Sequence, residues 1–259
     1  MVYTHILYEL TDHIGRITLN RPEKRNALNR SAIAELIHAL ATIREDAQVY
    51  LVVVTGAGDE AFCSGADMND FLNKDALAKR EQNEAYRRLC KAFLEVGKPV
   101  IGAINGLALA GGAGLTLLFD LVLSSERARF GFPEIKVGIF PMMVMANLFR
   151  VIGRRKAMEL VMTGEIISAR EAERIGLINR AVPHEQLHSE VNRLTSNLLQ
   201  FSPSTLRLGK EAFYRSSDLS ANEALDYLKE MATLVLLTED AKEGLDAFLA
   251  KRKPRWKGR

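Results

Sequence analysis

The pattern of apolar and polar positions near the start of the chain predicts two strands followed by a helix. Residues 4–10 and 13–20 alternate between apolar and polar well enough for two strands, with a turn at Thr11 and Asp12. Over residues 31–45, apolar side chains recur at helical spacing, at Ile33, Leu36, Ile37, Leu40 and Ile43. We therefore expect an amphipathic helix across 31–45, with one face turned toward a core.

Short, nearly continuous apolar runs recur through the middle of the chain. They cover residues 50–55, 100–105 and 120–124, and runs of this length fit strands that are buried on both faces. The order strand, strand, helix recurs here, although no sequence repeat marks the turns. By themselves these patterns predict an α/β fold.

Beyond about residue 184 the pattern is helical only. Apolar spacing over residues 224–235 predicts one helix, and Thr238 begins another. Earlier, Ser168-Ala-Arg-Glu171 is typical of a capping box, and Gly176 closes the short helix that follows it. The apolar surface of the C-terminal helices should be buried against the rest of the chain or against another subunit.

Two loops rich in small residues each follow a buried strand and precede a helix, at residues 57–68 and 103–114. A loop without bulky side chains exposes main-chain N–H groups at a helix start, where they favour negative charge. Glycines that allow close packing of helix and sheet explain the second loop equally well. The presence of two such loops favours an oxyanion hole, because each can direct one N–H group at the same oxygen.

The composition is that of an ordinary globular protein. The chain has 259 residues, of which 47% are hydrophobic and 26% charged, and this length fits one core with a terminal appendage. Cys63 and Cys90 suggest neither a disulfide framework nor a metal site. Without a signal-type segment or an apolar run near the ~20 residues that span a membrane, we expect a cytoplasmic protein with no membrane partner.

Positive charge is concentrated at the C-terminus. Six of the 35 basic residues lie among the last nine positions, so the rest of the chain carries 29 basic against 32 acidic residues. This balance argues against a nucleic-acid-binding body. The tail is either a solvated terminus or a binding element, and RNA binding is the remotest alternative.

Six short motifs, in order over nearly the whole chain, resemble the crotonase superfamily, also called the enoyl-CoA hydratase/isomerase family. They are Leu19-Asn-Arg-Pro22 with Arg25-Asn-Ala-Leu28, Ala61-Phe-Cys-Ser-Gly-Ala-Asp67, Lys98-Pro-Val-Ile-Gly-Ala-Ile-Asn-Gly106, Ala128-Arg-Phe-Gly-Phe-Pro-Glu134, Met162-Thr-Gly164 with Ala169-Arg-Glu-Ala172, and Glu243-Gly-Leu-Asp-Ala-Phe-Leu-Ala-Lys-Arg252. The resemblance implies a ClpP-like spiral of ββα units over residues 1–195 and a helical trimerisation region over 196–259. It also implies a homotrimer or a dimer of trimers.

The same resemblance assigns the chemistry. The N–H groups of Ala66 and Gly111 would bind the thioester oxygen of an acyl-CoA and stabilise an enolate. Glu134 would move the proton, and its apolar neighbours should raise its pKa toward a useful range. Related hydratases carry a second glutamate that falls at Gly114 in this chain.

The remaining site predictions concern substrate binding. Coenzyme A enters as part of the substrate, so no separate cofactor and no metal are expected. By resemblance, Lys24 and Arg25 lie near the ribose or phosphates of the coenzyme, and Lys251 or Lys253 could hold its phosphates. The full set of predicted substrate-binding positions is Lys24, Arg25, Ala27, Gly65, Asp67, Met68, Gly112, Pro133, Phe140 and Met142.

The missing acid at residue 114 leaves three functions open. Double-bond isomerisation of an enoyl-CoA needs one base and ranks first. Hydration by a single glutamate is the alternative, provided that other groups hold the water. The third reading is a non-catalytic acyl-CoA-binding subunit. The segment Met142-Met-Val-Met145 combines helix packing with a flexible apolar lining for an acyl group.

Overall fold

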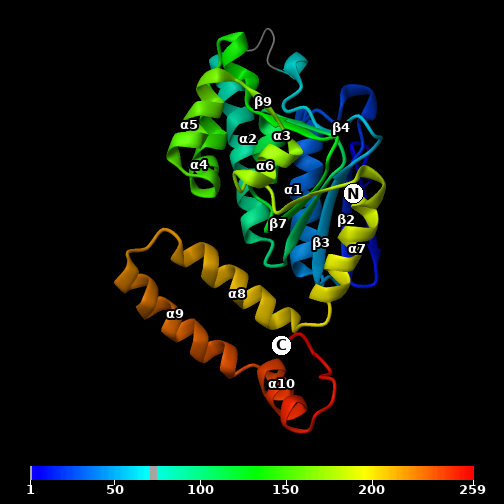
Figure 1. Ribbon diagram of the computed structural model, residues 1–259, viewed down its shortest axis with the longest axis vertical. Helices are drawn as coiled ribbons and strands as arrows, with labels where there is room; N and C mark the ends of the chain where they lie inside the picture. The colour runs from blue at the N-terminus through cyan, green and yellow to red at the C-terminus, as the bar shows by residue number, and fades with distance from the viewer. Residues whose placement is uncertain (1, 71–74) are drawn as a thin grey trace.

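A computed structural model describes residues 2–70 and 75–259. Figure 1 shows an α/β body with three C-terminal helices set apart beneath it. The main sheet has the strand order β1-β2-β3-β5-β7-β10, parallel except for β1 against β2. Its strands are β1 (Ile6–Thr11), β2 (Ile14–Leu19), β3 (Leu51–Gly56), β5 (Val100–Ile104), β7 (Leu121–Ser125) and β10 (Arg180–Val182).

A second, smaller sheet has the order β4-β6-β8-β9. Its strands are β4 (Ala61–Cys63), β6 (Leu107–Leu109), β8 (Arg129–Gly131) and β9 (Ile166–Ser168). After the first hairpin, which lies wholly in the main sheet, three successive turns of the chain each supply one strand to the main sheet, the next to the second sheet, and then a helix. The predicted spiral of ββα turns is therefore present.

Helices of the body lie on both faces of the main sheet, and others pack beside the second sheet (Figure 1). They are α1 (Arg30–Glu45), α2 (Ala76–Glu95), α3 (Gly111–Thr116), α4 (Met142–Ile152), α5 (Arg154–Thr163), α6 (Ala169–Arg174) and α7 (Leu187–Leu198). Short 3-10 helices lie at Pro22–Lys24, Met68–Asp70, Pro133–Val137 and His184–Gln186. Helix α1 starts where Asn29 accepts a hydrogen bond from the Ala32 amide, at 2.8 Å, which satisfies one donor of its first turn.

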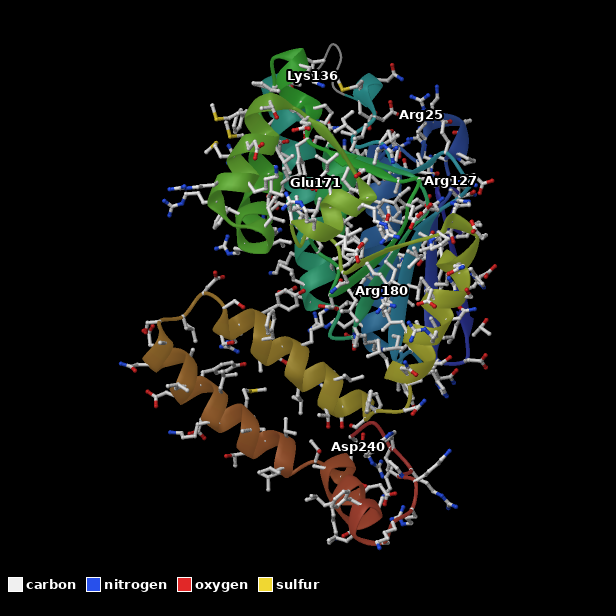
Figure 2. All side chains as sticks on the ribbon, in the orientation of Figure 1. Arg25, Arg127, Lys136, Glu171, Arg180 and Asp240 are labelled. Carbon is white, nitrogen blue, oxygen red and sulfur yellow. The ribbon has the colours of Figure 1, made fainter. Side chains whose placement is uncertain are left out.

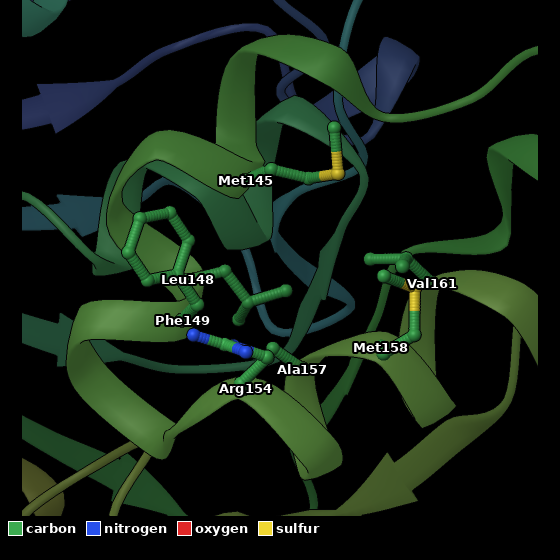
Figure 3. Close-up of a pocket in the computed structure, with 7 residues that line it drawn as sticks. All are labelled: Met145, Leu148, Phe149, Arg154, Ala157, Met158 and Val161. Atoms are coloured by element: carbon green, nitrogen blue, oxygen red, sulfur yellow. The ribbon is translucent and has the colours of Figure 1, made fainter.

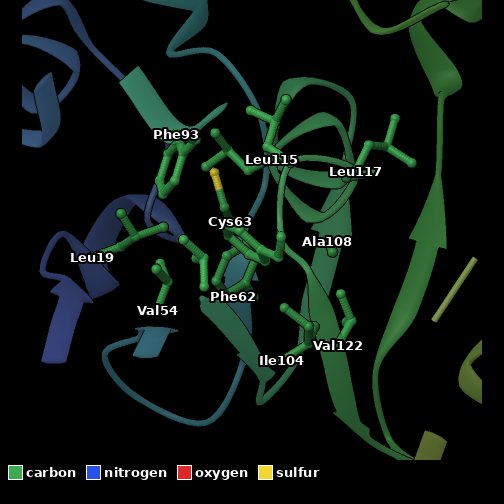
Figure 4. Close-up of a cluster of buried hydrophobic side chains, with 14 of the residues drawn as sticks. Leu19, Val54, Phe62, Cys63, Phe93, Ile104, Ala108, Leu115, Leu117 and Val122 are labelled. Carbon is green, nitrogen blue, oxygen red and sulfur yellow. The ribbon is translucent and has the colours of Figure 1, made fainter. Parts of the chain in front are cut away.

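Alternate residues of β3 enter two different cores. Val52 and Val54 join the large cluster between the sheets and helices α1 and α2, together with Phe62 and Phe93 (Figure 4). Leu51 and Val53 belong to a smaller cluster that α7 covers. Burial on both faces explains why this strand reads as a continuous apolar run.

The C-terminal arm consists of α8 (Pro203–Ser216), α9 (Ala221–Leu236) and α10 (Glu239–Leu249). Helix α8 is fastened to the body by Asp120, which accepts hydrogen bonds from Lys210 Nζ and Tyr214 Oη, both at 2.8 Å. Lys210 Nζ also donates to the Lys98 carbonyl oxygen at 3.0 Å. A buried ammonium requires such partners, so this cluster fixes where the arm leaves the body.

The expected elements agree with the structure, with small shifts. The first hairpin turns at Asp12 and His13, both with positive φ, one residue beyond the predicted turn. Ser168 accepts from the Glu171 amide as a cap should, but the Glu171 carboxylate pairs with Arg174, so only half of the capping box forms. The boundary predicted at residue 195 falls inside α7.

The predicted basic tail folds back along α10. Arg252 pairs with Glu243 at 2.6 Å, and Lys257 and Arg259 both pair with Glu239. The Asp240 carboxylate, at the arm end of the molecule in Figure 2, accepts from the Lys257 amide at 2.6 Å. Part of the tail's charge is thus neutralised within the arm, which weakens the RNA-binding alternative. None of the helices described is both long and apolar enough to cross a membrane.

Candidate active site

Three loops meet at one edge of the second sheet. Strands β4, β6 and β8 are parallel neighbours, so the segments that follow them emerge on the same side. Leu109 of β6 pairs with Gly131 of β8, and the Ala110 amide donates to the Gly131 carbonyl at 2.9 Å. This register brings together the residues after Cys63, after Leu109 and after Gly131, which include all three predicted catalytic residues.

The two predicted amide donors are close in space. A methyl group built on Gly111 would lie 3.9 Å from the Ala66 nitrogen, and one built on Gly65 would lie 3.3 Å from the Gly111 nitrogen. Gly65 adopts φ +104, a conformation that favours glycine. The loops therefore approach each other so closely that residue 65 has no room for a side chain.

Hydrogen bonds on one side of the first loop orient the Ala66 amide. Leu28 donates to the Gly65 carbonyl at 2.8 Å, and its own carbonyl accepts from the Asp67 amide at 2.9 Å. The Gly65 carbonyl and the Ala66 N–H belong to one trans peptide group and point in opposite directions, so the Ala66 N–H points away from Leu28. Gly111 opens α3, where an amide has no partner within the helix.

Backbone strain accompanies this arrangement. Ala110, just before α3, has φ 51 and ψ −128, a region that residues with a side chain seldom occupy. Its amide and carbonyl are both fixed, the first to Gly131 and the second by the Gly114 amide at 2.9 Å. These bonds hold the strained residue, and with it the direction of the Gly111 amide.

Glu134 lies in the 3-10 helix Pro133–Val137 that follows β8. Its Oε2 atom is inaccessible to solvent and has no hydrogen-bond partner among residues 2–70 and 75–259. Burial raises the pKa of this carboxyl group above its usual value, and a hydrogen bond from its own amide opposes the rise. The predicted rise in the pKa of Glu134 is thus supported by its surroundings.

Gly114 could not carry a glutamate in this structure without rearrangement. A Cβ atom built there would overlap the Tyr86 hydroxyl and would lie 2.5 Å from Val144 Cγ1. Tyr86 Oη donates to the Gly111 carbonyl at 3.1 Å. The sequence analysis missed Tyr86. On α2 it lies at helical spacing from Leu89 and Phe93, which are both fully buried, and this spacing is typical of a residue that only packs against the core.

The structure gathers some of the other predicted binding residues around these loops. Pro133 precedes Glu134, and Gly112 packs so tightly that a Cβ there would overlap the Cys63 carbonyl oxygen, which is the close-packing role of a glycine. Asp67 pairs with Arg21 at 2.9 Å and thereby fixes the first loop. Ala27 is buried, and its carbonyl accepts from Arg21 at 2.5 Å.

The predicted coenzyme and acyl residues lie further out. Lys24 is exposed, and Arg25 pairs with Glu60 at 2.6 Å. Arg25 and Lys136 both lie at the end of the molecule opposite the C-terminal arm (Figure 2). Met68 and Met142 are exposed and Phe140 is half-buried.

The methionine-rich segment opens α4 and serves two purposes. Val144 is buried against Gly114. Met145 lines an apolar pocket of about 250 Å³ between α4 and α5, with Leu148, Phe149, Arg154, Ala157, Met158 and Val161 (Figure 3). That pocket contains none of the predicted site residues.

Other chemistry finds little support in the described part of the chain. Cys63 is buried, and desolvation raises the pKa of its thiol to about 12, as expected for a packed residue. Residues 2–70 and 75–259 contain no group of three or more His, Cys, Asp or Glu side chains placed to hold a metal ion.

The whole chain matches known proteins. A family model described as enoyl-CoA hydratase/isomerase matches residues 9–259. The crotonyl-CoA hydratase of Syntrophomonas wolfei is 34% identical, with 98% of each chain covered. The 2,3-dehydroadipyl-CoA hydratase of Escherichia coli is 36% identical, with 94% of each covered.

Solved structures agree. The enoyl-CoA hydratase from Bacillus anthracis superposes with a TM-score of 0.95 at 34% identity, over 99% of this chain and all of that one. The ββα spiral with its helical C-terminal arm is therefore the crotonase fold that the sequence predicted. The chain belongs to the enoyl-CoA hydratase/isomerase family, and the protein is an enzyme of that family.

These comparisons bear on the three functions left open. The relatives are named as hydratases, which favours the single-glutamate hydratase over the isomerase that we ranked first. The hypothesis of a non-catalytic acyl-CoA-binding subunit is wrong, because the protein belongs to a family of enzymes and its relatives are named as such.

Proposed function

We propose that the protein is an enoyl-CoA hydratase in which Glu134 is the single catalytic carboxylate. The observation that carries the proposal is the unpartnered, buried Oε2 atom of Glu134, on a loop that emerges beside the amides of Ala66 and Gly111. The names of the relatives support hydration as the reaction. A carboxylate left without an internal partner is free to exchange protons with a substrate.

The oxyanion amides carry the first part of the mechanism. The thioester oxygen of a 2-enoyl-CoA binds between the N–H groups of Ala66 and Gly111. As water attacks C3, the electrons of the C2–C3 double bond move toward that oxygen and an enolate forms. One such donor lowers the barrier by about 3 kcal/mol, because it is fixed in place before the charge develops.

Glu134 carries the second part. Its carboxylate takes a proton from the water as the C3–O bond forms, and then gives the proton to C2 as the enolate collapses. The product is a 3-hydroxyacyl-CoA, with one water added across the double bond. A raised pKa suits this double role, since the group must both accept and release a proton.

Double-bond isomerisation is the second candidate, and the absence of a side chain at Gly114 is the observation that favours it. A single base can remove a proton from C2 of a 3-enoyl-CoA and return it to C4 on the same face, so that the double bond moves from C3–C4 to C2–C3 and becomes conjugated with the thioester. The same amides would stabilise the intervening dienolate. Isomerisation needs no bound water, and this requirement separates the two reactions experimentally.

The binding partners extend the proposal. Lys24, Arg25 and either Lys251 or Lys253 would contact the coenzyme, and Arg25 would then exchange Glu60 for a phosphate. We propose a homotrimer or dimer of trimers in the cytoplasm, with no separate cofactor, no nucleic acid and no membrane partner. Large exposed apolar side chains on the arm support assembly, among them Leu225, Leu236, Leu237, Phe248 and Leu249.

Product analysis tests the proposed function. Wild type and Glu134→Gln are incubated with crotonyl-CoA and, separately, with 3-hexenoyl-CoA, and the products are separated by chromatography. We expect wild type to form 3-hydroxybutyryl-CoA and the variant to form almost none. Conversion of the 3-enoyl substrate to its 2-enoyl isomer, without hydration of crotonyl-CoA, would reject the hydratase in favour of the isomerase.

A further inference from the structure

A tyrosine hydroxyl from α2 reaches the main chain of the site. Tyr86 Oη donates to the Gly111 carbonyl at 3.1 Å, and its ring carbon Cε2 would lie 3.6 Å from a methyl group built on Gly111. The same hydroxyl fills the space beside Gly114, where a Cβ would overlap it. Tyr86 therefore occupies the space into which a side chain at residue 114 would project.

This hydroxyl and the Glu134 carboxylate approach the same region from different elements. Gly111 follows β6 and Glu134 follows its parallel neighbour β8, so the two loops leave the sheet side by side. Burial raises the pKa of Tyr86 well above its usual value, and the Cys90 and Cys63 thiols and the Glu134 carboxylate contribute further. The phenol thus stays neutral at ordinary pH and is unsuited to act as a base.

A neutral phenol that donates its proton to a carbonyl still has lone pairs that can accept a hydrogen bond. Donation to the Gly111 carbonyl also polarises the hydroxyl and makes its oxygen a better acceptor. Glu134 Oε2, without a partner in the described chain, is a second acceptor. A water molecule has two protons, so two acceptors can hold it with a lone pair directed at the substrate.

Resting on the hydratase function proposed above, we propose that Tyr86 positions the attacking water. The water donates one hydrogen bond to Tyr86 Oη and the other to Glu134, while Tyr86 in turn donates to the Gly111 carbonyl. This arrangement gives a site with a single carboxylate a second contact to its water, and the missing side chain at Gly114 is what makes room for the phenol.

The protons balance without any transfer through the phenol. When the water oxygen bonds C3, the proton directed at Glu134 leaves with the carboxylate and is later delivered to C2. The proton directed at Tyr86 remains on the oxygen and becomes that of the product hydroxyl. Tyr86 therefore acts on the orientation of the water only.

The test compares Tyr86→Phe with Tyr8→Phe, using crotonyl-CoA or whichever 2-enoyl-CoA the wild type hydrates fastest. Tyr8 also carries a buried hydroxyl, one without a partner in the described residues, and it lies in β1 away from the site. We expect Tyr86→Phe to lower kcat for hydration about 10- to 100-fold, a typical cost of misplacing a reactant. KM should change less than threefold, and Tyr8→Phe should leave both constants unchanged.

A second readout separates water positioning from a structural effect on Gly111. Acetoacetyl-CoA, a β-keto thioester whose enolate oxygen would occupy the same amides, serves as a competitive inhibitor. Its inhibition constant should stay within twofold in Tyr86→Phe if only the water is lost. A weakening of inhibition in step with kcat would overturn the proposal, because Tyr86 would then act through the oxyanion amides.

Two other results also decide the matter. Unchanged hydration in Tyr86→Phe, with an active wild type, would overturn the role of Tyr86 and leave the hydratase function standing. A wild type that hydrates no 2-enoyl-CoA would instead reject the proposed function, and the role of Tyr86 with it.

Discussion

The oxyanion side and the acid–base side of this site are held in different ways. On the first, Ala66 and Gly111 offer main-chain amides at the ends of two strands, in loops so close that a methyl group on Gly65 would lie 2.8 Å from Ala110 Cβ. On the second, Glu134 offers a side chain from one short 3-10 helix, in which the next three residues are exposed.

The difference predicts opposite sensitivities to mutation. Backbone donors are indifferent to which side chain they carry, but they fail when an added Cβ moves the loop. An isosteric replacement of a catalytic side chain is tolerated structurally, yet it removes the group that accepts and releases the proton. The oxyanion side should therefore couple activity to stability, and the acid–base side should separate them.

Glu134→Gln should have the largest effect on activity. General acid–base catalysis contributes about 10²- to 10⁴-fold, so we expect kcat for hydration to fall within that range while the fold is retained. Steady-state kinetics and thermal unfolding measure the two quantities. Glu185→Gln, at an exposed glutamate in another 3-10 helix (His184–Gln186), is the matched control and should change neither. A Glu134→Gln enzyme with the kcat of wild type would show that Glu134 does not transfer the proton.

Gly65→Ala should lower activity and stability together. Its methyl group would lie 3.0 Å from the Leu109 carbonyl oxygen, and alanine disfavours φ +104. Displacement of the Ala66 amide should reduce kcat/KM by about 10²-fold, with a fall in melting temperature.

Gly176→Ala provides the matched control for that variant. Gly176 also has a positive φ, of +78, with no described atom within 4 Å of its built Cβ. We expect it to lower stability by about 1 kcal/mol from backbone strain and to leave kcat/KM unchanged. If both variants lost stability but neither lost activity, the oxyanion loop would not depend on close packing.

Asp67→Asn should have an intermediate effect, because it weakens the support of the first loop without touching the amides. Burial alone would raise the pKa of this carboxyl group, but hydrogen bonds from Arg21 and Asn69 lower it overall. We expect about a tenfold loss of kcat/KM and a stability loss of about 1 kcal/mol. Because the folded pKa is lowered, the stabilisation by Asp67 is present above the unfolded pKa and lost as pH falls through the folded one. The stability difference between wild type and variant should accordingly shrink in acid.

The smallest expected effect is the pH dependence of stability at Glu134. Its pKa is raised in the folded state, so the folded protein binds this proton more tightly than the unfolded chain. Stability contributed by Glu134 is therefore lost as pH rises through the window between the two pKa values. Glu134→Gln should gain melting temperature relative to wild type at about pH 7, and this gain should vanish near pH 4. If the gain in melting temperature increased in acid instead, the pKa of Glu134 would be lowered in the folded state rather than raised.

The sequence predicted the elements better than it predicted the site. Apolar spacing anticipated α1, β3 and α9, because burial on one or two faces leaves a direct periodicity in the chain. The small-residue loops also indicated where main-chain donors meet, since glycines are required where backbones approach, but the choice of Ala66 and Gly111 came from the family resemblance.

The periodicity of the sequence does not predict contacts between elements that are distant along the chain. Tyr86 carries no signal of its own, because its helical spacing with Leu89 and Phe93 is what core packing produces. The meeting of Tyr86 with Gly114 joins α2 to α3 across the fold, and no local pattern encodes it. Likewise, the pairing of tail residues such as Arg252 with α10 depends on how the arm folds back.

The pH dependence of kcat/KM for crotonyl-CoA hydration, in wild type and Glu134→Gln, tests most directly the claim that one ionisable group works beside two amides that do not titrate. The account predicts a single ionisation on the acid side in wild type, above the ordinary glutamate pKa, because Glu134 must be ionised to accept the proton of water. That limb should be absent from the residual activity of the variant. Two ionisations on the acid side of the wild-type profile, or the same acid-side fall in kcat/KM in both proteins, would contradict the claim that Glu134 is the single catalytic carboxylate.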